Sequence, residues 1–273
     1  CSQSNLEKLL SNENIFYKEY IENIGFKNSH IAEELKSKIK KIYKKGFINT
    51  LRSGDTGVGY TLETLLGIPA NSSRNPDYKG IEIKAGRMRT KKSGRTTIFS
   101  QVPNWELSRL KSSKDILFER GKYNEKKKRH QLFHELVTTK TNSYNMRLEL
   151  DPSIEVLYQI YIEDSFKEKD VLWNINHLKK RLIEKHHETF WVTAETIGKS
   201  GDDKEQFRYS SIKHTGNIDP NAFPILLNEG IISLDYTIKE KKKGIAKDQG
   251  YLFKISSKNL DMLFSSVKEY KFN

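Results

Sequence analysis

The chain is nearly free of cysteine, since Cys1 is the only one among its 273 residues. A single thiol cannot form an intrachain disulfide framework, and it cannot supply a zinc site made of several cysteines. This composition is typical of proteins in a reducing compartment, so we expect a cytoplasmic location. Whether Cys1 is the native start or a trimmed end is left open.

Long apolar segments are also missing from the sequence. No run approaches the ~20 residues that a membrane-spanning helix needs, and no secretory signal is visible. We therefore expect no membrane partner. The glycine-rich stretch "GDTGVGYT" at 54–61 lacks the Gly-Lys-Ser/Thr ending of a P-loop, which argues against a nucleotide site of that type.

Acidic residues are fewer than basic ones. The chain has 35 Asp and Glu against 48 Lys and Arg, which gives a formal net charge of +13. Clustered cations attract phosphate groups and release their counterions, so a polyanion such as nucleic acid is the favoured partner. The alternative is a generally basic proteome, because the abundance of Lys, Asn and Ile is typical of an AT-rich genome.

The hydrophobic pattern predicts a mixed α/β protein. Helices are expected over residues 4–45, around 62–66 before Gly67 and Pro69, in "NINHLKKRLIEKHH", and near 260–263. Strands are expected where β-branched and aromatic residues gather or alternate: "GIEIKA", "TTIFSQV", "KDILFERG", "YNMRLELD", "EVLYQIYI", "ETFWVTAETI", "GIISLDYTI" and "YLFKI". The sheet is expected to be largely antiparallel or mixed. The charged runs at 122–129 and 239–243, and the basic segment "KEKKKGIAKDQG", are expected to be exposed loops or turns.

The stretch "NPDYKGIEIKAGR" at 75–87 places charged residues in an otherwise apolar strand. Strand side chains alternate between faces, so Glu82 and Lys84 share one face, about 7 Å apart along the strand. Ile81, Ile83 and Ala85 occupy the other face, which can pack on a core. A bend at residues 79–80 would bring the carboxylate of Asp77 back beside that of Glu82.

These residues can support phosphodiester hydrolysis. Two close carboxylates repel each other unless a cation lies between them, and hard oxygen ligands suit Mg²⁺. A nearby lysine, here Lys84, can orient an attacking water or stabilise a pentavalent phosphorane. Glu63 lies beside the apolar stripe of the short upstream helix and could also approach the site. The alternative is an amphipathic edge strand that carries a surface Glu–Lys pair.

The segment "GRMRTKKSGR" follows this strand directly and carries five cations: Arg87, Arg89, Lys91, Lys92 and Arg95. They are expected to hold the phosphates of the scissile strand, and the alternative is a solvated loop without a function. Other polar residues have weaker claims. His186 and His187 end a polar helix and are expected to lie in solvent. His130 and His134 have helical spacing without a zinc-binding pattern, and Glu195 is expected to be a surface acid.

"GDTGVGYTLETLLGI…NPDYKGIEIKAGR" resembles the metal-site region of the MvaI/BcnI family of type II restriction endonucleases. It is also similar, more distantly, to the mismatch-repair nicking enzyme MutH, and both belong to the PD-(D/E)xK nuclease superfamily. "TIFSQVPNW", "TKTNSYN" and "LLNEGIISLDYTI…KKKGIAKDQGYLFKI" resemble further parts of the family in order and spacing. The resemblance covers about residues 30–265, and residues 1–29 look like a helical N-terminal extension.

The resemblance implies a superfamily fold, in which a mixed sheet is flanked by helices and two lobes surround a DNA cleft. A catalytic lobe at 30–150 and a DNA-recognition lobe at 151–273 are expected, although the lobes could interleave. Asp77 and Glu82 would ligate Mg²⁺ together with the carbonyl of Ile83, and Lys84 would position or activate the water. Glu63 would touch a second metal or form a hydrogen bond near the first. Mn²⁺ would substitute for Mg²⁺, whereas Ca²⁺ would support DNA binding without cleavage.

The C-terminal hairpin is the expected DNA reader in this resemblance. Lysine suits guanine acceptors, glutamine suits adenine and aspartate suits the cytosine amino group, whereas lysines that touch only phosphates position the protein without reading sequence. Phosphate contacts are favoured for Lys241, Lys242 and Lys243, and base contacts for Lys247, Gln249 and Lys254. Family members carry His and Arg in parts of this hairpin, so Gln249 and Lys254 leave the recognition sequence open. The residues expected at DNA are Lys241, Lys242, Lys243, Lys247, Asp248, Gln249, Tyr251 and Lys254.

We therefore expect a Mg²⁺-dependent, sequence-specific endonuclease of bacterial cytoplasm that cuts double-stranded DNA and leaves 5′-phosphate ends. It is expected to act as a monomer, and a cognate DNA methyltransferase is a possible partner. Three alternatives stay open: a MutH-like, methylation-responsive nicking enzyme, a non-catalytic DNA-binding protein on the same scaffold, and an RNA-binding protein. The last is disfavoured because no RNP-like pattern is present.

Overall fold

The computed structural model describes residues 29–69, 75–88 and 94–273. The chain forms two compact units, and each is assembled from separate segments. Unit 1 comprises the chain up to Thr90 together with Glu184–Ile218 and Phe264–Asn273, and unit 2 comprises Lys91–Ile183 and Asp219–Leu263. The units therefore interleave along the chain, and neither is a continuous half. The expected extension at 1–29 lies almost wholly outside the described residues.

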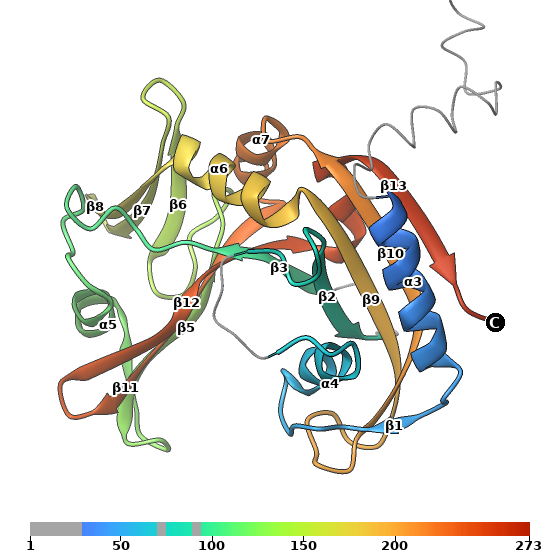
Figure 1. Ribbon diagram of the computed structural model, residues 1–273. Helices are drawn as coiled ribbons and strands as arrows, with labels where there is room; N and C mark the ends of the chain where they lie inside the picture. Colours follow the sequence, from blue (N-terminus) through green and yellow to red (C-terminus); the bar gives the residue numbers. More distant parts are fainter. Residues whose placement is uncertain (1–28, 70–74, 89–93) are drawn as a thin grey trace, which may run out of the picture. The chain divides into compact units, whose positions relative to one another are not determined.

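Unit 1 is built on a sheet in the order β1-β10-β9-β2, with β13 paired to the other part of β10. Its strands are β1 (Ile48–Asn49), β2 (Glu82–Arg87), β9 (Glu188–Ile197), β10 (Gln206–Ile218) and β13 (Phe264–Lys271). β2 runs parallel to β9, and the other pairs are antiparallel. The helices are α3 (Ser29–Tyr43), which packs along β10, and α4 (Gly57–Leu65), which packs on β2 (Figure 1).

The core of unit 1 forms between this sheet and its helices. Leu35 and Ile39 of α3 are fully buried with Leu62 of α4, and they share one cluster with Ile81 and Ile83. Each such side chain contributes about 1.5–3 kcal/mol when it leaves water. This packing confirms the helical spacing in α3 and the alternation in β2, because the isoleucines turn inward and leave the charged residues on the opposite face.

Unit 2 contains two sheets. One has the order β3-β12-β11-β5-β4 and the other the order β6-β7-β8. The first is made of β3 (Arg95–Ser100), β4 (Lys122–Asn124), β5 (Arg129–Leu136), β11 (Ile232–Lys242) and β12 (Ile245–Ser256), and the second of β6 (Met146–Asp151), β7 (Val156–Glu163) and β8 (Phe166–Asn174). Its other elements are α5 (Ser113–Arg120), α7 (Ala222–Asn228) and the 3₁₀ helix η1 (Ser257–Leu263). α6 (Ile175–His186) begins in unit 2 and ends in unit 1.

Several local predictions were wrong. "KDILFERG" is not a strand but α5, because Ser112 caps the helix by accepting a hydrogen bond from the Asp115 N–H. The expected basic turn is part of β11 and β12, which continue as a long hairpin with a turn at Gly244 (Figure 1). The histidines of the basic segment lie on β5 and not on a helix. The elements that were not predicted are β1, β4, β5, β8, β10, β13 and α7.

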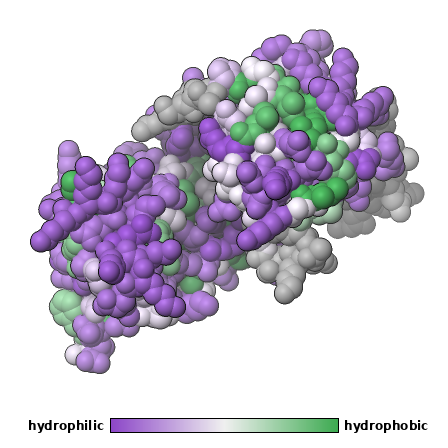
Figure 2. Space-filling model, turned by 90° about the horizontal axis from the view of Figure 1, so that it is seen from below, coloured by the Kyte–Doolittle hydropathy of each residue, from purple (hydrophilic) through white to green (hydrophobic). Residues whose placement is uncertain are grey.

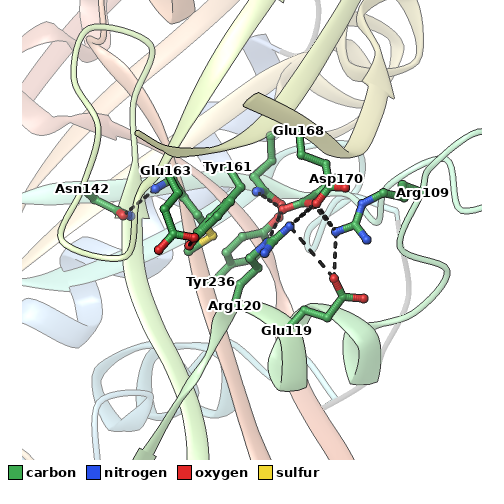
Figure 3. Close-up of polar contacts among 11 residues, drawn as sticks. Arg109, Glu119, Arg120, Asn142, Tyr161, Glu163, Glu168, Asp170 and Tyr236 are labelled. Carbon is green, nitrogen blue, oxygen red and sulfur yellow. Dashed lines mark hydrogen bonds and ion pairs between the residues drawn. The ribbon is translucent and has the colours of Figure 1, made fainter. Parts of the chain in front are cut away.

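A buried ionic network organises unit 2 (Figure 3). The carboxylate of Asp170 on β8 is fully buried and accepts hydrogen bonds from Arg109, Arg120 and Gln159. Gln159 lies 3.4 Å from the hydroxyl of Tyr236 on β11. The network thus connects both sheets of the unit with α5, and we expect it to hold the base of the β11–β12 hairpin in place.

The surface is largely polar on the face shown in Figure 2, where hydrophobic side chains form only limited patches. Within the described residues, no helix combines the length and the apolar character that crossing a membrane requires.

Candidate active site

The loop before β2 folds Asp77 back onto the strand. Tyr78 and Ile81 form two mutual backbone hydrogen bonds around Lys79 and Gly80, both of which have positive φ. Such a two-residue turn reverses the chain tightly. The Asp77 carboxylate accepts a hydrogen bond from the Ile83 N–H at 3.0 Å. The expected bend at residues 79–80 is therefore present, and it brings Asp77 beside the start of β2.

Glu82 is fully buried between two ammonium groups. Its Oε1 lies 2.9 Å from Nζ of Lys84, and its Oε2 lies 2.7 Å from Nζ of Lys185. Burial raises the pKa of Glu82, Asp77 acts in the same direction, and the two lysines oppose this shift. The arrangement places a buried, cation-held carboxylate next to Asp77, as phosphodiester chemistry would require.

The backbone of Ile83 offers one further oxygen to this site. In an extended strand, the N–H and the C=O of one residue point to the same side. The Ile83 N–H bonds Asp77 and not β9, so its carbonyl also points away from β9, toward the side of Asp77. Among the described residues, β2 is the last strand of the sheet on that side.

Glu63 on α4 belongs to the same electrostatic environment. Burial is the main cause that raises its pKa, and the negative charges of Asp77 and Glu82 add to the effect, whereas Lys84 and Arg52 lower it. The structure therefore places all four predicted acidic and basic residues near one another in unit 1. Arg52, whose guanidinium lies 3.7 Å from the centre of the Tyr60 ring, is a neighbouring cation that the sequence interpretation missed.

The donor set fits a divalent cation of the Mg²⁺ type. Mg²⁺ is usually held by one or two carboxylates and keeps several waters, so two acids and a carbonyl suffice. Asp77, Glu82 and the Ile83 carbonyl supply hard oxygens of this kind at one strand edge. Among the described residues, no group of three or more His, Cys, Asp or Glu side chains could hold a metal ion.

The cations after β2 have varied surroundings. Arg87 forms a two-pronged ion pair with the buried carboxylate of Glu205 and also donates to the carbonyls of Gly54 and Asp55. Its guanidinium therefore holds two loops together, which corrects the expectation that it is free for phosphate. Arg89, Lys91 and Lys92 lie outside the described residues.

In unit 2, Arg95 and Lys254 converge on one carboxylate. Arg95 donates to both oxygens of Asp235, and Nζ of Lys254 lies 2.7 Å from Asp235 Oδ2. Arg95 also contacts Glu135 and Ser233. Both cations are thus anchored on the sheet by Asp235, and each keeps part of its side chain at the surface.

The tip of the β11–β12 hairpin is exposed as expected, with Lys241, Lys242, Lys243, Lys247 and Gln249 at the surface. Two other expectations need correction. Asp248 accepts hydrogen bonds from the Ser113 hydroxyl and from the Gly250 N–H, so its carboxylate stabilises the hairpin. Tyr251 is only 1 % exposed and packs against Trp105 and Tyr236, so it is a core residue and not a groove contact.

Apart from Lys254, the residues on the outer face of the sheet formed by β5, β11 and β12 were not predicted to contact DNA. Leu132, Leu136 and Tyr236 point inward and are buried, so their strand neighbours point outward. This outer face carries Arg129, Gln131, Phe133, Glu135, Asp235, Thr237, Lys239 and Lys254. In the sequence, the charged run at 239–243 was the signal that pointed to this face. The contribution of β5 could not be seen, because β5 was not predicted.

The sequence did not predict the surroundings of two residues at the end of α6. Lys185 contacts Glu82, although the two are far apart in sequence. His186 is fully buried and not in solvent; its ring stacks on Trp191 and its Nδ1 lies 2.9 Å from Thr189 Oγ1. Glu195 lies within β9 and is 3.9 Å from Arg208, as a surface acid would be.

The chain was compared with known proteins. The model of the MvaI/BcnI restriction endonuclease family matches residues 36–264. The solved complex of restriction endonuclease MvaI with cognate DNA is similar with a TM-score of 0.75 and 24% identity, over 87% of this chain and 97% of that one. MvaI without DNA gives a TM-score of 0.49 and 24% identity, over 88% of this chain and 97% of that one.

The search of curated proteins gave no match. The family model nevertheless spans most of the chain, and the likeness to the DNA complex of MvaI establishes the restriction-endonuclease fold that the sequence predicted. The chain thus belongs to the MvaI/BcnI restriction endonuclease family and is a type II site-specific deoxyribonuclease.

Proposed function

We propose that the protein hydrolyses double-stranded DNA in a Mg²⁺-dependent reaction that leaves 5′-phosphate ends, with unit 1 as the catalytic unit. The observation that carries this proposal is the arrangement of Asp77, Glu82 and Lys84 at the edge of β2. A strand edge that only paired charges at a surface would not bury Glu82 completely and fold a second acid back beside it. This argues against a merely amphipathic edge strand.

Each residue of the site has a proposed role in the reaction. Asp77, Glu82 and the Ile83 carbonyl would hold Mg²⁺, which supplies Lewis-acid stabilisation of the phosphorane charge when bound. The Lys84 ammonium, 34 % exposed, is placed to donate a hydrogen bond to an incoming water or to a phosphate oxygen. Glu63, whose pKa is raised, would accept or share a proton near that water. Arg52 is a cation close enough to balance these acids.

Substitution of Lys84 tests the proposed site. Lys84→Ala removes a charged donor from the reacting phosphate, and losses of about 10²–10³-fold in rate are typical for one such donor. We expect this loss in Mg²⁺-dependent plasmid cleavage, with DNA affinity in Ca²⁺ unchanged. Lys41→Ala, which removes an exposed lysine of α3, is the matched control and should cut normally. Wild-type cleavage by Lys84→Ala would show that the active site lies elsewhere.

For recognition we propose unit 2, with the outer face of β5, β11 and β12 and the tip of their hairpin against the DNA. The solved MvaI relative was captured with its cognate DNA, which supports double-stranded DNA as the partner. Gln131 and Lys239 lie opposite each other, and their donors suit adenine and guanine edges respectively. Phe133, which is 43 % exposed on the same outer face of β5 as Gln131, suits contact with a thymine methyl group.

The three lysines at the hairpin tip give a quantitative test of phosphate binding. Each phosphate contact contributes about 0.9 to the slope of log affinity against log salt concentration. Changing Lys241, Lys242 and Lys243 to Ala should therefore weaken binding to all sequences alike and reduce the slope by roughly 3. The control removes Lys40, Lys41 and Lys44 of the α3 region, an equal charge change in unit 1. Equal slopes for both triple variants would contradict the proposed contact.

We propose that the enzyme acts as a monomer, because one site of this kind per chain would cut one DNA strand at a time. We also propose that a cognate methyltransferase protects the host DNA. The MutH-like alternative differs in outcome, since it predicts nicked products whose formation depends on methylation. Product analysis therefore separates the two functions.

A further inference from the structure

The end of α6 carries a lysine that faces the candidate active site from a distant part of the sequence. The Lys185 side chain is 14 % exposed, and its Nζ lies 2.7 Å from Glu82 Oε2. Burying an ammonium group is unfavourable unless it is paired closely. An apolar residue at this helix position would cover the strand without the cost of burying a charge. The presence of a lysine therefore indicates that the Glu82 carboxylate needs a cationic partner here.

The packing of α6 fixes where this ammonium lies. His186 stacks on Trp191 with ring centres 5.2 Å apart and contacts Thr189 through its Nδ1. In the parallel register, Thr189 lies opposite Glu82 and Trp191 opposite Lys84. Paired residues of neighbouring strands project to the same face of a sheet, so the helix end lies on the face that carries Glu82 and Lys84.

The two lysines contact different oxygens of one carboxylate. Lys84 lies at Oε1 and Lys185 at Oε2, and both oxygens are shielded from solvent. From this division we infer that Lys185 is a positioning residue: it anchors Oε2 of Glu82 and so fixes the carboxylate that would hold the metal. This inference depends on the proposed Mg²⁺-dependent function.

Lys185→Met tests the inference, because methionine keeps the length and the packing of the side chain but removes the charge and the donor. Loss of a partner that orients a metal ligand typically lowers metal affinity or activity by 10–100-fold, and we expect about that effect. Mn²⁺ binding to the DNA-free protein, followed by electron paramagnetic resonance, gives a readout that is independent of turnover. The Mg²⁺ concentration for half-maximal cleavage should rise in parallel, while DNA affinity without a divalent metal stays unchanged.

Two further variants separate positioning from folding. Lys185→Arg keeps a cationic donor and should recover most of the Mn²⁺ affinity, whereas Lys185→Gln, which retains polarity without charge, carries the test if the methionine variant does not fold. Lys179→Met alters a half-buried lysine of the same helix and should bind Mn²⁺ normally. Unchanged Mn²⁺ binding in a folded Lys185→Met protein would overturn the inference and leave the proposed function intact. A wild-type protein that neither binds Mn²⁺ nor cuts DNA would instead overturn the proposed function itself.

Discussion

Glu82→Gln is expected to lower Mg²⁺-dependent DNA cleavage by at least about 10³-fold. A metal ion supplies several kcal/mol of transition-state stabilisation, and about 4 kcal/mol corresponds to this factor. Glutamine preserves the shape of the side chain but removes the negative charge that both lysines contact and that a cation would need. Single-turnover cleavage of a plasmid, with enzyme in excess, measures the effect directly.

A second measurement on the same variant excludes a general loss of structure. Its DNA affinity without a divalent metal should remain within about threefold of wild type, because Glu82 is buried and lies in a different unit from the proposed recognition face. Glu269→Gln, which changes an exposed acid of β13 in the same unit, is the matched control and should cut normally. Full cleavage by Glu82→Gln would contradict the assignment of Glu82 as a metal ligand.

The largest expected loss of stability comes from Asp170→Asn. Asp170 holds two arginines and Gln159 in the interior of unit 2, and Arg120 is itself only 9 % exposed (Figure 3). Removing one partner of a buried ion pair costs about 3–5 kcal/mol. We expect the lower end of this range, because Arg120 keeps its ion pair with Glu168 when it loses Asp170. Urea unfolding should show this decrease in the free energy of unfolding, whereas Asp164→Asn, in the exposed β7–β8 turn, should change it by less than about 0.5 kcal/mol.

The same residue predicts a pH dependence. Burial alone would raise the pKa of Asp170, but hydrogen bonds from Arg120, Arg109 and Gln159 outweigh it and lower the pKa in the folded protein. A carboxyl whose folded pKa is lowered stabilises the protein above its unfolded pKa, and this contribution disappears as the pH falls through the folded pKa. The stability gap between wild type and Asp170→Asn should therefore be full near pH 7 and close below about pH 4, given an unfolded aspartate pKa of about 3.9. A gap that stays constant with pH would contradict the ionic role.

The features that sequence predicted well are those with a local cause. The alternation in β2 follows from isoleucine spacing, and α3 follows from apolar residues at helical intervals. The bend before β2 depends on Lys79 and Gly80, which are adjacent to the strand. α5 was mistaken for a strand because Ile116, Leu117 and Phe118 form a short apolar run, while the cap formed by Ser112 was overlooked.

The features that sequence missed depend on distant contacts. Lys185 meets Glu82 at the end of α6, where the neighbouring His186 stacks on Trp191 of β9, and nothing in the local pattern of α6 identifies that partner. In the sequence, Arg87 is one of five neighbouring cations and has no distinguishing feature. Its ion-pair partner Glu205 lies far along the chain, so the local pattern does not reveal the pair. Tyr251 was assigned to DNA by its place in a basic hairpin, although its position in the sheet turns it inward.

Cleavage of unmethylated and methylated plasmid, with the ends of the product mapped, tests the central claim most directly. The account predicts that Mg²⁺ gives discrete fragments with 5′-phosphate ends at a defined sequence, that Mn²⁺ substitutes, and that Ca²⁺ permits binding without cleavage. Substitution of Asp77 by Asn should abolish the fragments under the same conditions. Tight, specific binding of DNA with no cleavage of any substrate in Mg²⁺ or Mn²⁺ would contradict it.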